Sequence, residues 1–357
     1  MSDAALVGRL LDEYHDRPAT QVRLLAGSQR EERVAYSVTL PDGQVQVIRA
    51  FRADEPVPVH AGAMIAEPVS DWLLGRARTL AWLERHGYPA PRPVRTRTGE
   101  LIAVAGTWLA WATTFVSGPV ARPTLAQLWL TGAALGRLHS VPVLAGPVPD
   151  LAGGGEDDAP GPASRHPGRA VPVTRARLER VASLVPAAWR PLYAQFIQVN
   201  QEVGGAAGGL AEVIVHGDVW ARNVVVTDPA DVTFIDWESG GLGLAVLDLG
   251  NSLLECHLDS ELPGSEAAPW LITPDPDRIA ALAGGYASVR PVTGADLELL
   301  PAAAKFAAAV VGAIHFEAAL ISGVSGPAMD ARLARLQNRI AAAGPVTDIA
   351  RRALASG

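Results

Sequence analysis

The first third of the chain contains short runs in which apolar and polar residues alternate. A two-residue period is typical of half-buried β-strands, and Pro41-Asp42-Gly43 between two such runs is typical of a tight turn. Apolar residues at helical spacing, such as Trp72, Leu80 and Leu83, indicate a helix further along. We predict strands at residues 21–25, 33–40, 44–51, 101–105 and 108–115, and helices at residues 4–14 and 70–86.

The pattern becomes helical after Val116-Ser117-Gly118-Pro119, a sequence that interrupts regular structure and offers a hinge. We therefore predict an α+β protein with a lobe boundary there, separating residues 1–116 from residues 117–357. The segment 145–173 is rich in Gly, Pro, Ala and Asp and is predicted to be a flexible insertion. Helices are predicted at residues 124–140, 174–185, 189–203, 244–257, 277–286, 296–321 and 329–343, with Thr124 as an N-cap, Leu125, Leu128, Leu135 and Leu138 on one face, and a glycine-rich linker at 204–209.

Composition narrows the class of protein. The formal net charge is −7 and no cluster of basic residues is obvious, which argues against a nucleic-acid partner. The single cysteine, Cys256, excludes a disulfide within the chain. No basic segment followed by an apolar segment opens the chain, and no uninterrupted apolar run reaches the roughly 18 residues that span a bilayer. We expect a cytoplasmic monomer or homodimer with no membrane partner.

One stretch, residues 213–238, is the most informative for function. Asp218 lies five residues before Asn223, and Asp236 ends an apolar run thirteen residues later. Two β-type runs, 222–227 and 232–235, flank an Asp-Pro-Ala-Asp turn, so a hairpin would bring Asn223 and Asp236 together. Carboxylate and amide oxygens suit Mg²⁺, which takes its other ligands from water and phosphate. Asp218 would then be available to orient and deprotonate an attacking hydroxyl.

The spacing His216-Gly217-Asp218-x-x-x-x-Asn223, followed by Ile235-Asp236-Trp237-Glu238, resembles the catalytic signature of the aminoglycoside phosphotransferase and choline kinase family. The resemblance extends more loosely to 82–91, to Gly136-Arg137-Leu138-His139, and to 243–249. It implies a bilobal protein-kinase-like fold, with a small antiparallel sheet and one helix in the first lobe and a larger, mainly helical second lobe. It also implies a structural role for His216 and for Asp248, which would tie the loop backbone.

The resemblance also reveals a departure in the first lobe. Relatives carry a phosphate-binding lysine on the third strand and a glutamate on the next helix, whereas this chain has Arg49 and Arg76. Arg49 can still contact phosphates, so we favour an active enzyme over a nucleotide-binding pseudokinase. Glu67 or Asp71 remain alternatives for the missing acid. The expected nucleotide contacts are Arg49, the loop residues Gly27 and Ser28, and the hinge residues Thr114, Phe115 and Val116.

The predicted activity is transfer of phosphate from ATP or GTP, assisted by Mg²⁺, to a hydroxyl group of a small molecule. The resemblance favours an antibiotic of aminoglycoside type, and hence antibiotic resistance, with a metabolite amino alcohol or sugar as the alternative. Asp218 is the predicted catalytic residue, and Asn223 and Asp236 are the predicted metal ligands. Carboxylates would suit an amine-bearing acceptor. The candidate acceptor contacts are Glu255, His257, Asp259 and Glu317.

Overall fold

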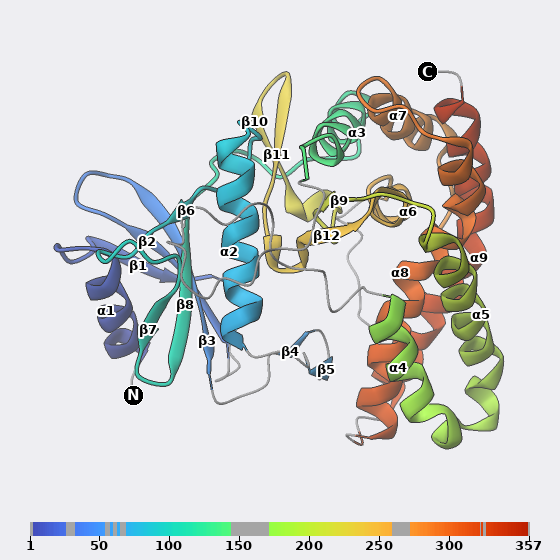
Figure 1. Cartoon of the computed structure of the whole chain (residues 1–357), viewed down its shortest axis with the longest axis horizontal. Helices are drawn as coiled ribbons and strands as arrows, with labels where there is room; N and C mark the ends of the chain where they lie inside the picture. Colours follow the sequence, from blue (N-terminus) through green and yellow to red (C-terminus); the bar gives the residue numbers. More distant parts are fainter. Residues whose placement is uncertain are drawn as a thin grey trace. The chain divides into compact units, whose positions relative to one another are not determined.

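The structure is a computed structural model that describes residues 3–25, 33–53, 58–59, 63–64, 69–143, 171–258, 272–321, 323 and 326–355 (Figure 1). These residues form two compact units. The first contains the described residues up to Ser117 except 59–63, and the second contains those from Gly118 onward together with 59–63. We describe each unit by itself.

The first unit is built on an antiparallel sheet with the strand order β1-β2-β3-β8-β6, and β7 also pairs with β8. Ile48 and Ala50 of β3 are buried in a core shared with α1, because alternate side chains of a strand point to the same face. Arg49 and Phe51 therefore point to the opposite face, where the Phe51 ring meets the Trp72 ring of α2 edge to face at 5.2 Å. The elements are α1 (Asp3–Tyr14), β1 (Gln21–Leu24), β2 (Arg33–Thr39), β3 (Val45–Arg52), α2 (Val69–Arg85), β6 (Pro93–Val94), β7 (Ala103–Ala105) and β8 (Trp108–Thr114). The chain also forms a pair of two-residue strands, β4 (Pro58–Val59) and β5 (Ala63–Met64), whose residues are divided between the two units.

The second unit is mainly helical and carries two small sheets, β10 with β11 and β9 with β12. The central helix α8 packs against four other helices of the unit. It is long and apolar enough to cross a membrane by length and composition alone, but 61% of its most apolar window is buried inside the unit. The elements are α3 (Leu125–His139), α4 (Val171–Val181), α5 (Arg190–Ala207), β9 (Glu212–Val215), β10 (Val224–Asp228), β11 (Asp231–Phe234), β12 (Gly241–Leu244), α6 (Ala245–Glu255), α7 (Pro276–Ala287), α8 (Gly294–Leu320) and α9 (Pro327–Leu354), with short 3₁₀ turns at Ala182–Leu184, Ala187–Trp189, Ala221–Asn223 and Trp237–Ser239.

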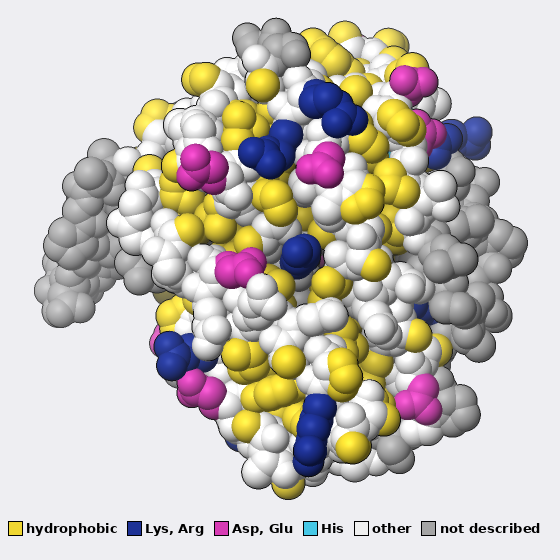
Figure 2. Space-filling model, turned by 90° about the vertical axis from the view of Figure 1, so that its right-hand side faces the viewer, with side chains coloured by type: hydrophobic (Ala, Val, Ile, Leu, Met, Phe, Trp, Pro, Cys, Tyr) yellow, Lys and Arg dark blue, Asp and Glu magenta, His cyan; other side chains and the backbone are white. Residues whose placement is uncertain are grey.

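The outer face that carries α5 and α9 has charged side chains of both signs interspersed among apolar and neutral ones (Figure 2). Apolar side chains also gather there in several small areas. The charges that are visible on this face therefore alternate in sign and form no single basic stripe.

The predicted α+β fold class is confirmed, since an antiparallel sheet dominates the first unit and helices dominate the second. Thr124 caps α3 as expected, accepting a hydrogen bond from the Gln127 amide. Of the four leucines expected on one face of that helix, Leu128, Leu135 and Leu138 are buried, whereas Leu125 in the first turn is 52% exposed. The part of the predicted insertion up to residue 170 lies outside the described residues, and residues 171–173 already belong to α4.

Two helices are longer than predicted. α5 continues through Gly204–Ala207, which were expected to be a linker, and α9 continues past Ala343 across Pro345 to Leu354. Val203 in α5 and Val346 in α9 are fully buried. Packing of Val346 outweighs the low helix propensity of Pro345, whereas Val203 precedes the two glycines and the residues of α5 after it are not buried.

The close approach of α3 and α7 depends on glycine. A Cβ atom at Gly285 would lie 2.0 Å from the carbonyl oxygen of Trp129, whereas one at the neighbouring Gly284 would meet nothing within 4 Å. We expect Gly285→Ala to lower the free energy of unfolding by about 2 kcal/mol or more, because the two helices must separate. Gly284→Ala should raise it by about 1 kcal/mol through helix propensity. Urea unfolding of both variants measures this difference, and equal stabilities would contradict the close packing.

Candidate active site

The hairpin β10–β11 brings Asn223 and Asp236 to the same end of two paired strands. Val224 pairs with Phe234, and the amide of Ile235 donates to the carbonyl of Asn223 at 2.9 Å. Asn223 thus lies directly opposite the residue that precedes Asp236. Segment 118–121 lies along the outer side of β10, where Val226 donates to Pro119 and Ala121 donates to Val224.

Asn223 also holds Asp218. Its side-chain Nδ2 donates to the carbonyl oxygen of Asp218 at 2.9 Å and to the Oδ2 of the same residue at 3.1 Å. Since the nitrogen of the amide faces Asp218, the Oδ1 of Asn223 is turned elsewhere and remains an acceptor. The structure therefore brings Asp218 and Asn223 into direct contact, as the hairpin interpretation expects.

Asp236 has an unusual backbone. Its φ is 64° and its ψ is 61°, which makes it the one described non-glycine residue with a positive φ. This left-handed region is unfavourable for most side chains, although Asp and Asn adopt it more readily than others. Such strain tends to occur at functional sites, where the surrounding structure holds it in place. Here the paired strand before Asp236 and the 3₁₀ turn after it set the direction of the carboxylate.

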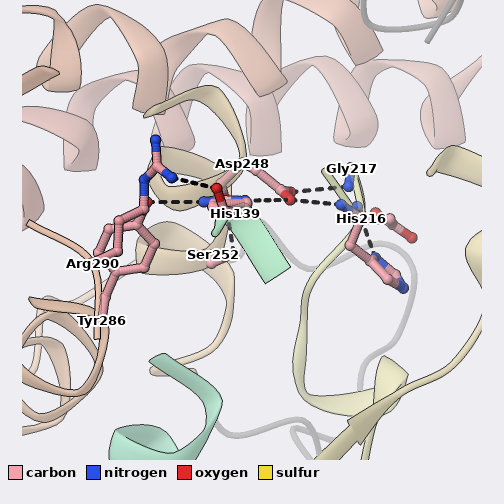
Figure 3. Close-up of polar contacts among 8 residues, drawn as sticks. His139, His216, Gly217, Asp248, Ser252, Tyr286 and Arg290 are labelled. Carbon is pink, nitrogen blue, oxygen red and sulfur yellow. Dashed lines mark hydrogen bonds and ion pairs between the residues drawn. The ribbon is translucent and has the colours of Figure 1, made fainter. Parts of the chain in front are cut away.

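Asp248 anchors the loop that carries Asp218. It lies in the first turn of α6, is 3% exposed, and accepts hydrogen bonds from the amides of His216 at 2.8 Å and Gly217 at 3.0 Å (Figure 3). Gly217 has a φ of 78°, a conformation that favours glycine. Asp248 therefore ties the loop backbone to α6, which is the structural role expected for it.

His216 joins the loop to the hairpin. Its Nε2 donates to the carbonyl of Ile235 at 2.9 Å, and its Nδ1 accepts from the amide of Asp218 at 3.3 Å. The ring is fully buried and packs edge to face on Phe234 and Trp237. Burial lowers the pKa of His216, so the ring is neutral and one nitrogen can accept. His216 thus fixes the loop relative to the residue before Asp236.

The donor set suits a metal ion shared with phosphate. Asn223 can offer Oδ1, and Asp236 can offer a partly exposed carboxylate. No group of three or more His, Cys, Asp or Glu side chains within the described parts of the chain is arranged to hold a metal. A divalent ion here would therefore need water or phosphate oxygens to complete its shell, which is how Mg²⁺ usually binds.

The predicted nucleotide residues of the first unit are only partly described. Arg49 lies on the α2 face of the sheet, directly opposite Trp111 of β8. The amide of Thr114 donates to Arg92 and that of Phe115 to Val45, so these two amides are engaged in the sheet. The amide of Val116 makes no hydrogen bond to the described backbone. Gly27 and Ser28 lie outside the described residues.

Arg76, which stands where relatives carry glutamate, is 1% exposed and its guanidinium lies 5.4 Å from the centre of the Trp72 ring. Asp71, an alternative for the missing acid, is exposed in the first turn of the same helix. Glu67, the other alternative, lies outside the described residues.

Two of the three predicted acceptor carboxylates lie in the described part of the chain, and both have basic partners in the second unit. Glu255 lies 2.5 Å from Arg339, and Glu317 lies 2.5 Å from Arg180 and 3.3 Å from Arg177. His257 is buried, with Nδ1 bonded to the carbonyl of Leu253 and Nε2 without a hydrogen-bond partner among the described residues. The neighbouring Cys256 contacts the carbonyl of Val219, so the end of α6 lies against the loop of Asp218. Asp259 lies outside the described residues.

Comparisons with known proteins agree with the motif. The family model of the phosphotransferase enzyme family matches residues 64–292. The homoserine kinase of Acidiphilium cryptum is 28% identical over 244 residues, and that of Gluconacetobacter diazotrophicus is 30% identical over 241 residues. Each alignment covers 66% of this chain and 66% of the relative, so the chain spans just under two thirds of these relatives. The predicted family resemblance is confirmed, and with it an enzyme of the small-molecule phosphotransferase type.

Solved structures of similar fold cover almost the whole chain. An amicoumacin kinase in complex with AMP-PNP, Ca²⁺ and Ami has a TM-score of 0.65 at 16% identity, covering 98% of this chain and 94% of that one. A spectinomycin phosphotransferase in complex with ADP and spectinomycin has a TM-score of 0.59 at 14% identity, covering 97% of each chain. A microcompartment-associated aminopropanol kinase has a TM-score of 0.58 at 18% identity, covering 96% and 97%. At these identities the likeness concerns the fold, and the predicted kinase-like fold is confirmed.

Three of the buried histidines of the second unit, His139, His216 and His257, should make its stability depend on pH. Burial lowers the pKa of His139, His216 and His257 below the ordinary value of 6.5. As the pH falls below 6.5, the unfolded chain takes up protons that the folded chain does not, so stability falls. We expect a loss of about 1 kcal/mol for each side chain between pH 7 and pH 5.5, measured by exchange of the most protected amides.

The variant His257→Gln tests whether the buried histidines cause the pH dependence of stability. It removes one of the three imidazoles without touching the loop of Asp218, and it should lose about one third of the pH dependence. An unchanged slope in the variant, or a stability of the second unit that stays constant over this interval, would contradict the prediction.

Proposed function

This chain belongs to the phosphotransferase enzyme family, and from that premise we propose that it transfers the terminal phosphoryl group of ATP or GTP to a hydroxyl group of a small molecule. The observation that carries the proposal is the direct contact of Asp218 with Asn223, at the hairpin end that also bears Asp236. The fixed loop backbone behind Asp218 supports it, because phosphoryl transfer depends chiefly on positioning and electrostatic stabilisation.

In this proposal Asp218 is the catalytic residue. Its carboxylate accepts a hydrogen bond from the acceptor hydroxyl, orients the oxygen toward the phosphorus, and receives the proton as the new bond forms. Asn223 stabilises that carboxylate and keeps it in one orientation. The Oδ1 of Asn223 and the carboxylate of Asp236 would hold Mg²⁺, which when bound supplies positive charge to the terminal phosphates.

We also assign nucleotide contacts in the first unit as proposals. Arg49 would contact phosphate oxygens, since a guanidinium can form two parallel hydrogen bonds to them. The hinge residues Thr114, Phe115 and Val116 would contact the base, with the amide of Val116 as the first candidate donor. Gly27 and Ser28 would lie near the phosphates.

For the acceptor we propose a small molecule that bears both a hydroxyl and an amino group. The two homoserine kinases share the highest identities described above, and homoserine is a hydroxylated amino acid. This moves a metabolite acceptor ahead of an antibiotic of aminoglycoside type, which stays the second candidate. Glu255, His257, Asp259 and Glu317 remain the proposed acceptor contacts, of which Glu255 is favoured because α6 reaches the loop of Asp218 at Cys256.

Substitution of Asp218 and Asp236 tests the chemistry. We expect Asp218→Ala to lower kcat by about 10²- to 10⁴-fold while nucleotide affinity is kept, because only the base is lost. Asp236→Asn should abolish metal-dependent nucleotide binding without unfolding the hairpin, because Asn also adopts positive φ. A coupled assay of nucleotide consumption and a calorimetric titration measure the two effects. The control Asp228→Asn removes a charge from the turn of the same hairpin and should change neither.

An acceptor panel tests the substrate class. Homoserine, amino alcohols and aminoglycosides are compared in the same assay, and we expect consumption of nucleotide with a hydroxylated amino acid or amino alcohol. Glu255→Gln should raise KM for that acceptor about tenfold with kcat kept, because a charge-assisted hydrogen bond is lost. Glu179→Gln, which breaks the exposed pair with Arg175, is the matched control. Nucleotide-induced thermal stabilisation without consumption across the panel would indicate a pseudokinase.

A further inference from the structure

A chain of hydrogen bonds runs from Arg290 to Asp248 through the interior of the second unit (Figure 3). His139, the last residue of α3, places Nε2 3.3 Å from Oδ2 of Asp248 and Nδ1 2.9 Å from the hydroxyl of Tyr286 in α7. The Arg290 guanidinium donates to the backbone carbonyl of His139. His139 and Tyr286 are 1% and 2% exposed, so water does not compete for these contacts.

The partners fix the direction of every proton in this chain. An ionised carboxylate has acceptors only, so Nε2 of His139 carries a proton and donates to Asp248. In a neutral ring Nδ1 then has no proton and accepts from the Tyr286 hydroxyl. Burial lowers the pKa of His139, which agrees with a neutral ring.

The opposite tautomer of His139 would disturb the hydrogen bonds by which Asp248 holds the loop of Asp218. With the proton on Nδ1, the lone pair of Nε2 would face the carboxylate of Asp248, and the buried carboxylate would lose one donor. A buried carboxylate without sufficient donors is strongly unfavourable. The carboxylate of Asp248 would then turn away from its place. Because the amides of His216 and Gly217 donate to its two oxygens, these two hydrogen bonds would weaken. The loop that ends at Asp218 would then be held less firmly.

We propose that Tyr286 and His139 are positioning residues for phosphoryl transfer, and that the Tyr286 hydroxyl, by donating to Nδ1, favours the histidine tautomer that keeps Asp248 locked on the loop of Asp218. The inference rests on the proposed function for its effect on turnover. It concerns the hydroxyl of Tyr286 and not the helix packing, since α3 and α7 meet through Gly132 and Gly285. The rings of His139 and Tyr286 also meet edge to face at 5.6 Å, a contact that phenylalanine retains.

The tautomer is tested first in the unchanged protein. Nitrogen chemical shifts of ¹⁵N-labelled histidine, assigned with the variant His139→Gln, should show His139 neutral at pH 7 with the proton on Nε2. A proton on Nδ1, or a doubly protonated ring, would overturn the proposal. This measurement needs no substrate, so it remains decisive even if the protein turns over no acceptor of the panel.

Tyr286→Phe tests the consequence. We expect exchange of the His216 and Gly217 amides to rise about tenfold, because the carboxylate that holds them is less restrained. We expect kcat to fall about tenfold, with KM for nucleotide and acceptor within about twofold, because alignment and not binding is lost. Unchanged exchange at these two amides together with an unchanged kcat would overturn the proposal.

Two further variants separate positioning from a general loss of stability. Tyr14→Phe removes another buried tyrosine hydroxyl, which donates to Ala110 at 2.9 Å in the first unit, and it should leave kcat and the two amides unchanged. In His139→Gln the side-chain amide can donate to Asp248 without help from Tyr286. Adding Tyr286→Phe in that background should therefore have little further effect, whereas a full additional loss would contradict the tautomer lock. Absence of turnover in the unchanged protein would refute the proposed function. The tautomer of His139 and the exchange of the His216 and Gly217 amides would still decide whether the hydrogen bonds from Tyr286 through His139 to Asp248 hold the loop of Asp218.

Discussion

The candidate active site depends on one buried negative charge. The carboxylate of Asp248 is fully enclosed, and burial alone would favour its neutral form. Hydrogen bonds from His139 and from the loop amides outweigh that effect, so the pKa of Asp248 lies below its ordinary value. Its place in the first turn of α6 adds the favourable field of the helix N-terminus. Because an anion without these donors could not remain buried, the carboxylate and the loop backbone can adopt only one mutual arrangement.

That arrangement is transmitted to the reacting groups through short contacts. Asp248 holds the amide of His216, and the side chain of His216 holds the carbonyl of Ile235, one residue before Asp236. Asn223 links the loop to the hairpin. Its side-chain amide donates to the carboxylate of Asp218, and its backbone carbonyl accepts from the amide of Ile235. The loop, the hairpin and α6 are therefore joined by bonds of about 3 Å at each step. A left-handed residue such as Asp236 can persist in such a frame, because relaxing it would break the neighbouring contacts.

Local patterns in the sequence were sufficient for most elements and for the hairpin motif. Alternation predicted β2 and β3, and helical spacing predicted α2 and α8, because these signals lie within each segment. The strands β9 and β12 were not predicted, since each is four residues long and its partner is remote in sequence. The end of α9 was wrong because side chains beyond Pro345, such as Val346, are buried and outweigh local propensity. The end of α5 was wrong because the helix continues through Gly204 and Gly205, and no buried side chain of α5 beyond them explains this. Nor could the sequence reveal that Glu255 and Glu317 are ion-paired, since their arginines lie on other helices.

The contacts that hold α2 against the sheet explain how the first unit can carry arginine at both positions, Arg49 and Arg76. The sequence resemblance implies an ion pair between the third strand and the following helix, at the places where this chain is expected to carry Arg49 and Arg76. Here the Phe51 ring of β3 meets the Trp72 ring of α2, and the same tryptophan supports the guanidinium of Arg76. Aromatic packing and a cation–π contact can fix a helix against a sheet without a carboxylate. Because α2 is held in this way, the loss of the usual glutamate is not in itself a sign that the enzyme has lost its activity.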